Sequence, residues 1–339
     1  MKPVFVDVDT GVDDALALLY LLASPEADLV GIASTGGNVA VQQVCENNLG
    51  LLELCRVTDI PVSKGAGATL SGPTRNPSRS HGPRGLGYAE LPPANARVTG
   101  YDSATAWVRA AHAFPGELIG VATGPLTNLA TALRAEPALP ALLRRLVIMG
   151  GCYDGTAAAE WNISVDPEAA AEVLTACCES TEPQRLPILC GLDLTRKVAM
   201  TPQHLARLAG AAGASTTTMS ADDPRGTRST ASNALIRLVE DALRFYMEAH
   251  NDNGDNGQQY LAHLHDPLAA AAALDPALVA TRPATVDVEL TGTRGVTATD
   301  WTGHRKPNAL IGIGVDAAVF SDRFIARVGT FARRVAEGV

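Results

Sequence analysis

Short runs of β-branched and other apolar residues alternate along the chain with longer runs in which alanine and leucine recur at helical spacing. The short runs are typical of strands buried on both faces, and the longer runs are typical of amphipathic helices. The strands expected in the first two thirds of the chain are Pro3–Val8, Leu29–Ser34, Leu118–Ala122, Leu146–Met149 and Pro187–Cys190. The helices expected between them are Asp14–Leu22, Val39–Cys55, one beginning near Leu126, and Pro167–Ala176. This alternation predicts crossover units and an α/β fold with a central, mostly parallel sheet flanked by helices.

The last third of the chain has a different pattern, with three strands joined by short turns and followed by a helix. These elements are expected at Thr285–Leu290, Gly295–Thr299, Leu310–Val315 and Asp322–Ala336. No internal repeat or linker interrupts the chain, so we expect residues 1–339 to form a single domain. Three loops, near residues 65–100, 210–232 and 251–258, are rich in turn-forming residues and longer than plain connections, and we expect them to be mobile.

Composition narrows the class of protein. The 339 residues are 46% hydrophobic and 19% charged, which is typical of a globular chain. A net charge of −9 argues against a nucleic-acid-binding face, and the lack of any run of about 20 apolar residues argues against a membrane span. Six cysteines without a C-x-x-C pair, and Asp7 within the first apolar run, indicate a cytoplasmic protein with reduced thiols. Oxidation of the adjacent Cys177 and Cys178 is the less favoured alternative.

The densest group of reactive side chains follows the first expected strand. Asp7, Asp9, Asp13 and Asp14 fall within eight residues, with Gly11 at the turn before a helix. Ligands of open α/β sheets bind beyond the carboxyl ends of the strands. One or two acids are ordinary at a helix N-terminus, but four repel one another unless a cation lies among them. A group of carboxylates suits Ca²⁺ or Mg²⁺, whereas zinc prefers nitrogen and sulfur donors.

This segment has three other interpretations. An EF-hand does not fit, because its sixth and twelfth loop positions are Val12 and Leu18. A metal-dependent phosphatase of the Asp-x-Asp type would use Asp7 as nucleophile and Asp9 as acid, but it also needs a downstream lysine and a second acidic cluster that the chain does not clearly offer. A catalytically silent ribose- or nucleoside-binding protein is the third interpretation, although a pure binder need not keep an acid and a base.

Residues Asp7–Ala15 resemble the nucleoside hydrolase family, whose pattern at this point is Asp-x-Asp-x-Gly-x-Asp-Asp-Ala. Further matches to that family follow in the same order along the chain. They are Gly36–Asn38, His81–Leu86, Gly124–Asn128, Met149–Gly151, Glu160–Asn162, Asp166–Ala169 and His265–Pro267. The resemblance implies a homo-oligomeric enzyme that hydrolyses the N-glycosidic bond of ribonucleosides to ribose and free base.

The resemblance also implies a Ca²⁺ ion at the bottom of the pocket. Its protein ligands would be the carboxylates of Asp9, Asp14 and Asp266 and the backbone carbonyl of Thr127, with two ribose hydroxyls and a water completing the shell. Asp9 would take a proton from the Ca²⁺-bound water. His265 would protonate the leaving base, a task for which its ordinary pKa near 6.5 is suited.

The remaining implied residues bind the substrate. Asp13 and Asn38 would hold the 2′-hydroxyl, and Asn162 the 3′-hydroxyl and, with Glu160, the 5′ side. His81, Met149 and Asp266 complete the expected substrate-binding set. The segment between Met149 and Glu160 is short and lacks the asparagine that the family often places against the 5′-hydroxyl.

The group that meets the base is left open by the sequence. Phe245, Tyr246 and Tyr260 are candidates, while His250 and His263 are expected to be surface or packing residues. Purine and pyrimidine nucleosides both remain open as substrates.

Overall fold

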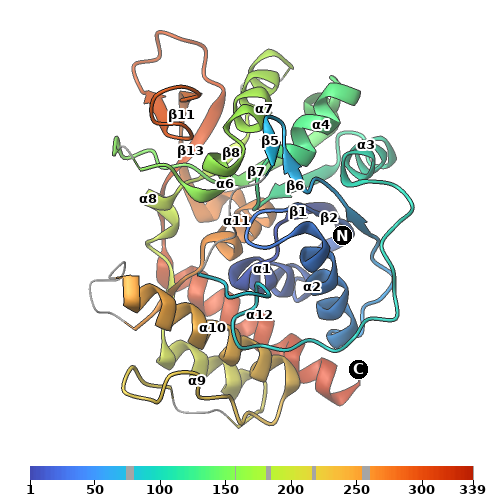
Figure 1. Ribbon diagram of the computed structural model, residues 1–339, viewed down its shortest axis with the longest axis vertical. Helices are drawn as coiled ribbons and strands as arrows, with labels where there is room; N and C mark the ends of the chain where they lie inside the picture. Colours follow the sequence, from blue (N-terminus) through green and yellow to red (C-terminus); the bar gives the residue numbers. More distant parts are fainter. Residues whose placement is uncertain (74–79, 157, 181–184, 216–218, 254–259, 339) are drawn as a thin grey trace.

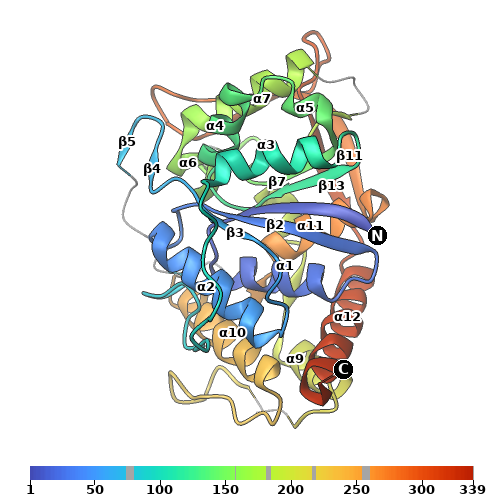
Figure 2. The ribbon, with the colours of Figure 1, turned by 90° about the vertical axis from the view of Figure 1, so that its right-hand side faces the viewer.

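The protein is built around a nine-stranded sheet (Figures 1 and 2). The computed structural model describes residues 1–73, 80–156, 158–180, 185–215, 219–253 and 260–338. In spatial order the strands are β12 (Thr297–Asp300), β11 (Val279–Val288), β13 (Ala309–Val315), β8 (Ile188–Cys190), β7 (Leu143–Met149), β6 (Leu118–Ala122), β1 (Lys2–Val8), β2 (Ala27–Ser34) and β3 (Val62–Lys64). The strands from β13 to β3 run parallel, and β11 is antiparallel to both of its neighbours. The predicted mostly parallel sheet is confirmed.

Helices cover both faces of the sheet (Figure 2). One face carries α1 (Val12–Leu22), α2 (Val41–Leu54), α9 (Pro202–Ala211), α10 (Ala234–Asn253), α11 (His265–Leu274) and α12 (Ala317–Glu337). The other carries α3 (Ser103–Ala113), α4 (Thr127–Ala135), α5 (Leu139–Leu142), α6 (Trp161–Val165) and α7 (Pro167–Ser180). Short elements complete the chain: β4 (Ala68–Thr69), β5 (Gly72–Pro73), α8 (Leu192–Thr195), β9 (Ala199–Met200), β10 (Ala262–His263) and a 3-10 turn at Pro276–Leu278.

Helix α11 positions much of the site, although its sequence carries no amphipathic stripe. Every residue from His265 to Leu274 is buried, because the helix lies between the sheet and α1. Its run of alanines lets neighbouring backbones approach closely. A helix that is apolar all round gives no periodic signal, so the helical prediction did not cover this segment.

Several predicted boundaries differ from the structure. Strand β11 begins at Val279 instead of Thr285 and includes Pro283, which is tolerated because β12 pairs only with the end of β11, from Thr285 onward. Helix α12 begins five residues early, where the Asp316 carboxylate accepts hydrogen bonds from the first backbone N–H groups.

Other predictions concern loops, thiols and the membrane. Helix α10 extends through Asn253, so the loop predicted from 251 starts later, and residues 254–258 lie outside the described residues. Cys177 is a free thiol, and the side chain of Cys178 lies outside the described part of the chain. Among the described residues, no helix is long and apolar enough to cross a membrane.

Candidate active site

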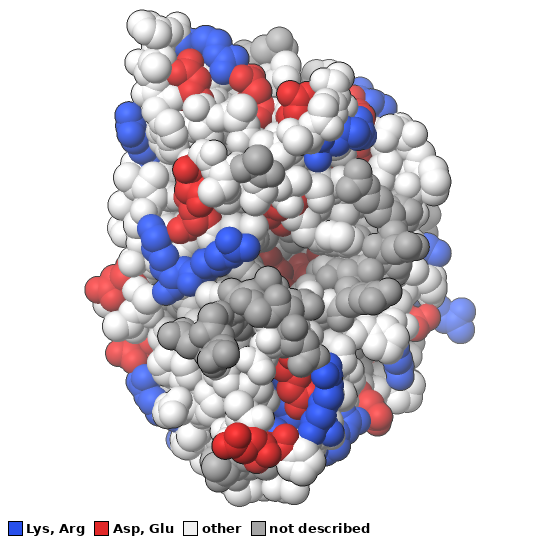
Figure 3. All heavy atoms as spheres, turned by 60° about the vertical axis from the view of Figure 1, so that its left-hand side comes forward, with Lys and Arg blue, Asp and Glu red and all other residues white. Residues whose placement is uncertain are grey.

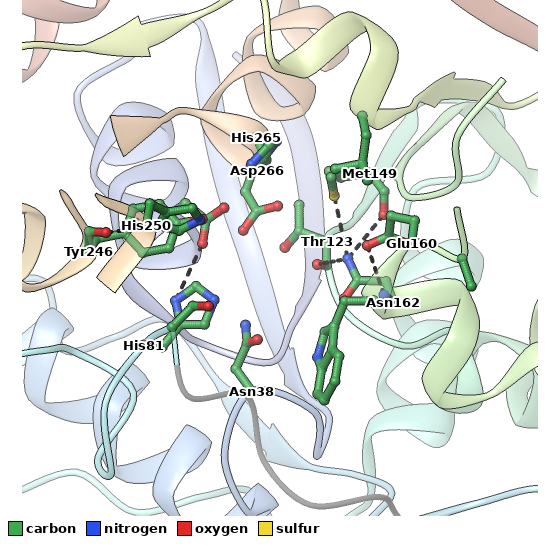
Figure 4. Close-up of a pocket in the computed structure, with 15 residues that line it drawn as sticks. Asn38, His81, Thr123, Met149, Glu160, Asn162, Tyr246, His250, His265 and Asp266 are labelled. Atoms are coloured by element: carbon green, nitrogen blue, oxygen red, sulfur yellow. Dashed lines mark hydrogen bonds and ion pairs between the residues drawn. The ribbon is translucent and has the colours of Figure 1, made fainter. Parts of the chain in front are cut away.

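The carboxyl edge of the sheet opens into a pocket of about 240 Å³ (Figures 3 and 4). Strand ends and helix starts converge there, so residues far apart in the sequence share one cavity. The predicted residues that line it are Asp13, Asn38, His81, Met149, Glu160, Asn162, His265 and Asp266. Asp9 and Asp14 are fully buried directly after β1 and at the start of α1. Figure 3 shows this face of the molecule hollowed, with acidic side chains in the depth of the hollow.

Three carboxylates meet at the bottom of the pocket. Asp13, Asp14 and Asp266, which we call the acid cluster, each offer one oxygen, and these oxygens all lie within 4.8 Å of one another. Asp14 accepts hydrogen bonds from the Gly11 backbone N–H at 2.9 Å and from the Thr123 hydroxyl at 2.6 Å. The acid cluster therefore shares Asp14 and Asp266 with the predicted ligand set and contains Asp13 in place of Asp9.

Asp9 lies beside the acid cluster and is held by Asn38. The Asn38 backbone N–H donates to Asp9 Oδ2 at 2.7 Å, and its side-chain amide donates to Oδ1 at 3.1 Å. Gly37 packs so closely on Asp9 that an added Cβ would come within 2.1 Å of Oδ2. The Gly-Gly-Asn turn after β2 thus fixes the orientation of this carboxylate.

The negative charges of these buried acids would be stabilised by a cation. Burial, and then the neighbouring carboxylates, raise the pKa of Asp9 and Asp266 well above the usual range and that of Asp13 to about 8. Among the described residues, the one ionisable nitrogen within 4.0 Å of these acids is His81 Nδ1, 3.8 Å from Asp13. Burial lowers the pKa of His81 to about 3, so this imidazole is neutral and cannot compensate the charge. Buried, all-oxygen donors of this kind fit a hard divalent cation.

The polar groups of Thr127 have hydrogen-bond partners within and beside α4. Its hydroxyl donates to Asp166 at 2.6 Å, and its carbonyl accepts from the Thr131 hydroxyl at 2.8 Å. Thr123, four residues earlier at the end of β6, lines the pocket and touches Asp14. The Thr127 carbonyl thus stays a prediction as a metal ligand, while the Thr123 hydroxyl is in direct contact with the acid cluster.

Asp7 is directed away from the pocket. Its carboxylate accepts hydrogen bonds from the Thr35 hydroxyl at 2.6 Å, Trp107 Nε1 at 2.8 Å and the Asn128 amide at 2.9 Å. A carboxylate whose oxygens are held by three donors away from the acid cluster is not placed to attack a substrate. This geometry argues against the phosphatase interpretation, which needs Asp7 as nucleophile.

His265 begins α11 at the edge of the pocket. Its Nδ1 lies 2.7 Å from the Thr195 hydroxyl, and the His263 ring is 5.6 Å away. Burial lowers the pKa of His265 well below its usual range, so the imidazole is neutral at neutral pH. The expectation of an ordinary pKa is corrected, because the side chain is almost fully covered. A neutral imidazole still carries one N–H donor.

Three rings in contact form one side of the pocket, which we call the aromatic wall: His81, Tyr246 and His250 (Figure 4). Tyr246 stacks on His81 with ring centroids 5.1 Å apart, and His250 meets Tyr246 edge-on at 4.1 Å. The His81 Nδ1 accepts a hydrogen bond from the Val12 backbone N–H at 3.1 Å, so Nε2 carries the hydrogen in the neutral ring. The aromatic wall offers flat apolar surface together with one N–H donor, His81 Nε2, because the His250 Nδ1–H donates to the Tyr246 backbone carbonyl at 2.8 Å.

The prediction of His250 as a surface or packing residue is wrong, because it lines the pocket. Its spacing of four residues from Tyr246 on α10 places both side chains on one helix face, a signal the sequence did contain. Of the three aromatic candidates for base contact, Tyr246 reaches the pocket. Phe245 instead packs against Tyr88 at 5.0 Å, and Tyr260 lines a separate cavity.

The end of β7 and the start of α6 supply a further set of lining residues, the α6 wall, made of Met149, Glu160, Trp161 and Asn162. Figure 4 shows Met149, Glu160 and Asn162 across the pocket from His81 and Tyr246. Glu160 caps the helix: its carboxylate accepts from the backbone N–H groups of Asn162 at 2.8 Å, Ile163 at 3.0 Å and Gly151 at 3.1 Å. The Asn162 amide donates to the backbone carbonyl of Thr123 at 2.7 Å, which leaves its own oxygen as an acceptor facing the pocket.

Comparison with known proteins identifies the family. The family model described as inosine-uridine preferring nucleoside hydrolase matches residues 4–322. The chain belongs to the nucleoside hydrolase family. A pyrimidine-specific ribonucleoside hydrolase of Citrobacter koseri is 34% identical over 97% of this chain and 99% of its own length, and one of Enterobacter sp. is 35% identical over 98% and 99%.

Solved structures of nucleoside hydrolases share the fold. A purine-preferring ribonucleoside hydrolase from Gardnerella vaginalis has a TM-score of 0.85 at 28% identity, covering 98% of this chain and 99% of that one. An inosine-guanosine nucleoside hydrolase has a TM-score of 0.79 at 25% identity, covering 97% and 99%. The resemblance, the α/β fold and the hydrolysis of ribonucleoside N-glycosidic bonds are thereby confirmed. The base is not decided, because the relatives' names include both pyrimidine-specific and purine-preferring enzymes.

Proposed function

We propose that this nucleoside hydrolase depends on Ca²⁺ and uses Asp9 as its general base and His265 as the donor to the leaving base. The observation that carries the proposal is the buried acid cluster at the bottom of the pocket, with Asp9 held beside it by Asn38 and with His265 in the pocket lining. Ionised carboxylates so close together are stable when a divalent cation lies among them.

Asp13, Asp14 and Asp266 would hold the ion, and the Thr123 side chain, which already orients Asp14, would support it. Ca²⁺ accepts six to eight oxygen donors, so ribose hydroxyls and water can complete its shell. When bound, the ion would lower the pKa of a coordinated water.

The chain's own residues supply binding and proton transfer. Asn38 holds Asp9 by two hydrogen bonds, so the carboxylate keeps one orientation while it takes up a proton. The free oxygen of Asn162 suits a ribose hydroxyl as its donor. Carboxylates around the sugar also stabilise the positive charge that develops on ribose as the bond to the base lengthens.

The leaving base would lie between the aromatic wall and His265. Aromatic faces stack on flat heterocycles, and neutral imidazole N–H groups donate hydrogen bonds to their ring nitrogens or carbonyl oxygens. The Thr195 hydroxyl, 2.7 Å from Nδ1, orients the His265 ring for this task.

The proposed function is tested by measuring ribose release from inosine, adenosine, guanosine, uridine and cytidine with the Ca²⁺-loaded enzyme. Ribose from at least one nucleoside supports the proposal and reveals the base preference. Calorimetric binding of a nucleoside without ribose release would instead support the silent binding protein. Release of phosphate from phosphate monoesters would support the phosphatase.

His265→Ala is expected to lower kcat about 10²-fold or more for nucleosides, and much less for p-nitrophenyl riboside. The reason is that p-nitrophenolate leaves without protonation, whereas a nucleobase needs a donor. Initial rates with both substrates check this, and Thr195→Val is the companion variant because it removes only the contact to Nδ1. Equal losses for the two substrates would contradict the assigned role.

A homo-oligomer in the cytoplasm is proposed as well. The family resemblance supports the assembly, and the five free cysteines among the described residues are typical of a reducing compartment. Light scattering coupled to gel filtration measures the assembly directly.

A further inference from the structure

Two segments that are far apart in the sequence meet beside the pocket. One is the acid turn, residues 9–14, which holds three of the buried carboxylates. The other is the His81 segment, residues 81–87, whose first residue belongs to the aromatic wall. They are in direct contact where the Val12 backbone N–H donates to His81 Nδ1 at 3.1 Å. The position of the aromatic wall relative to the acids therefore depends on how these two segments are held together.

Asn47 of α2 connects the two segments through its buried side chain. Its amide nitrogen donates to the Thr10 backbone carbonyl at 3.1 Å and to the Arg84 backbone carbonyl at 2.9 Å. An amide nitrogen carries two hydrogens, so both bonds are made at once. The amide oxygen accepts from the Gln43 side chain at 3.0 Å, which fixes the end of the amide that faces the carbonyls. Asn47 thus joins the acid turn to the His81 segment although it belongs to neither.

The contact between the two segments is close as well as polar. A Cβ added at Gly85 would lie 2.9 Å from the Thr10 carbonyl oxygen and 3.0 Å from the Asn47 amide nitrogen. One added at Gly11 would lie 2.6 Å from His81 Nδ1. Gly85 also has a φ of +83°, a conformation that residues with a side chain rarely adopt. The glycines allow the two backbones to approach, and Asn47 holds them at that separation.

We propose that Asn47 is a positioning residue for the reaction, because it holds the His81 segment against the acid turn and so sets the distance between the aromatic wall and the acid cluster. The inference rests on the proposed function, in which one substrate places its base at the wall and its ribose at the acids. Asn47 is not among the residues that line the pocket, so it acts through His81. A displaced His81 segment weakens binding, and a substrate that does bind favours the docked arrangement, in which both contacts are made.

The first test is Asn47→Leu, which removes both donors and keeps a branched side chain. In the Ca²⁺-loaded enzyme, KM for uridine or inosine, whichever is hydrolysed faster, is expected to rise about tenfold, as for a docked fraction reduced to about one tenth, while kcat changes by about twofold or less. Asn308→Leu is the matched control, since Asn308 is also buried and its amide exchanges two hydrogen bonds with Val286 of β11, far from β1 in the sheet. It should lose stability and keep the wild-type KM. An equally unchanged KM in Asn47→Leu would overturn the inference.

A double-mutant cycle distinguishes positioning through His81 from a general loss of packing. In His81→Ala the ring that Asn47 positions is absent, so the added Asn47→Leu change should raise KM by less than about twofold. The full rise in both backgrounds would show that Asn47 does not act through His81. Gly85→Ala is the second variant, because it forces the two segments apart with Asn47 in place. It should raise KM with the same dependence on His81, and a wild-type KM in Gly85→Ala would count against the inference even if Asn47→Leu does not fold.

Hydrogen exchange measured by mass spectrometry tests the inference without turnover. The Gly85 and Gly87 amides donate within the His81 segment, so their exchange reports how firmly it is docked. They are expected to exchange about tenfold faster or more in Asn47→Leu, and at the wild-type rate in Asn308→Leu. Equal rates in all three proteins would refute the role of Asn47. Absence of ribose release from every nucleoside would overturn the proposed function, and these exchange rates would then decide whether Asn47 holds the segment.

Discussion

Asp9→Asn is expected to lower kcat by about 10²- to 10⁴-fold for the preferred nucleoside, the range that a positioned general base contributes. The substitution is nearly isosteric, and an amide oxygen can still accept one hydrogen bond from Asn38. What is lost is the carboxylate's ability to take a proton. Steady-state kinetics at saturating substrate measure the loss, and KM should change much less than kcat because the sugar contacts remain.

Asp7→Asn is the matched control. Asp7 is as deeply buried as Asp9 and lies two residues away, but its carboxylate meets Trp107, Thr35 and Asn128 outside the pocket. In this variant the side-chain NH₂ group would face hydrogen-bond donors and leave one of them without an acceptor. The free energy of unfolding is therefore expected to fall by about 1–3 kcal/mol, while kcat stays within a few fold of the wild-type value. If Asp9→Asn behaved like Asp7→Asn, with altered stability and nearly normal turnover, Asp9 would not be the base.

The sequence predicted which acids lie together at the pocket because most of them are clustered locally. The acids Asp9–Asp14 follow a strand directly, and Asn38 follows the neighbouring strand, so the rule that parallel strands end at one edge brings them together. His265 and Asp266 are different, since their arrival at the same point depends on how α11 packs on α1. The ordered matches to a known family, and not a local pattern, predicted that contact.

The features that the sequence did not predict have physical causes at particular residues. Thr127 and Thr123 lie on either side of the turn between β6 and α4, and a sequence pattern does not say which of the two faces the acids. Glu160 lines the pocket as expected, and its carboxylate also accepts from backbone donors at the start of α6, a second role that appears only once the helix boundary is known. The low pKa of His265 arises from burial, which neighbours distant in sequence provide.

Removal of divalent cations by a chelator is expected to abolish turnover and to lower the melting temperature together. A ligand that binds only the folded chain stabilises it by about 2.7 kcal/mol at a hundredfold excess over Kd, which is a few degrees in Tm for a chain of this size. Without the ion, the carboxylates of the acid cluster repel one another or take up protons, as the raised pKa values of Asp13 and Asp266 indicate. Differential scanning calorimetry and ribose release, on the same chelated sample, measure both effects.

Two comparisons make this result specific to the acid cluster and to the ion. In Asp266→Asn the chelator should no longer change the melting temperature, because one of the three converging carboxylates is gone. Ca²⁺ should restore both stability and turnover to the chelated wild type, whereas Mg²⁺ at the same concentration should restore little, since Mg²⁺ gives up its waters reluctantly and demands octahedral geometry. Equal rescue by Mg²⁺ would contradict a calcium site while keeping a divalent one. If the melting temperature and kcat of the wild type were unchanged in chelator, the buried acids would act without a metal. Their raised pKa values would then mean that some of these carboxyl groups hold protons at the bottom of the pocket.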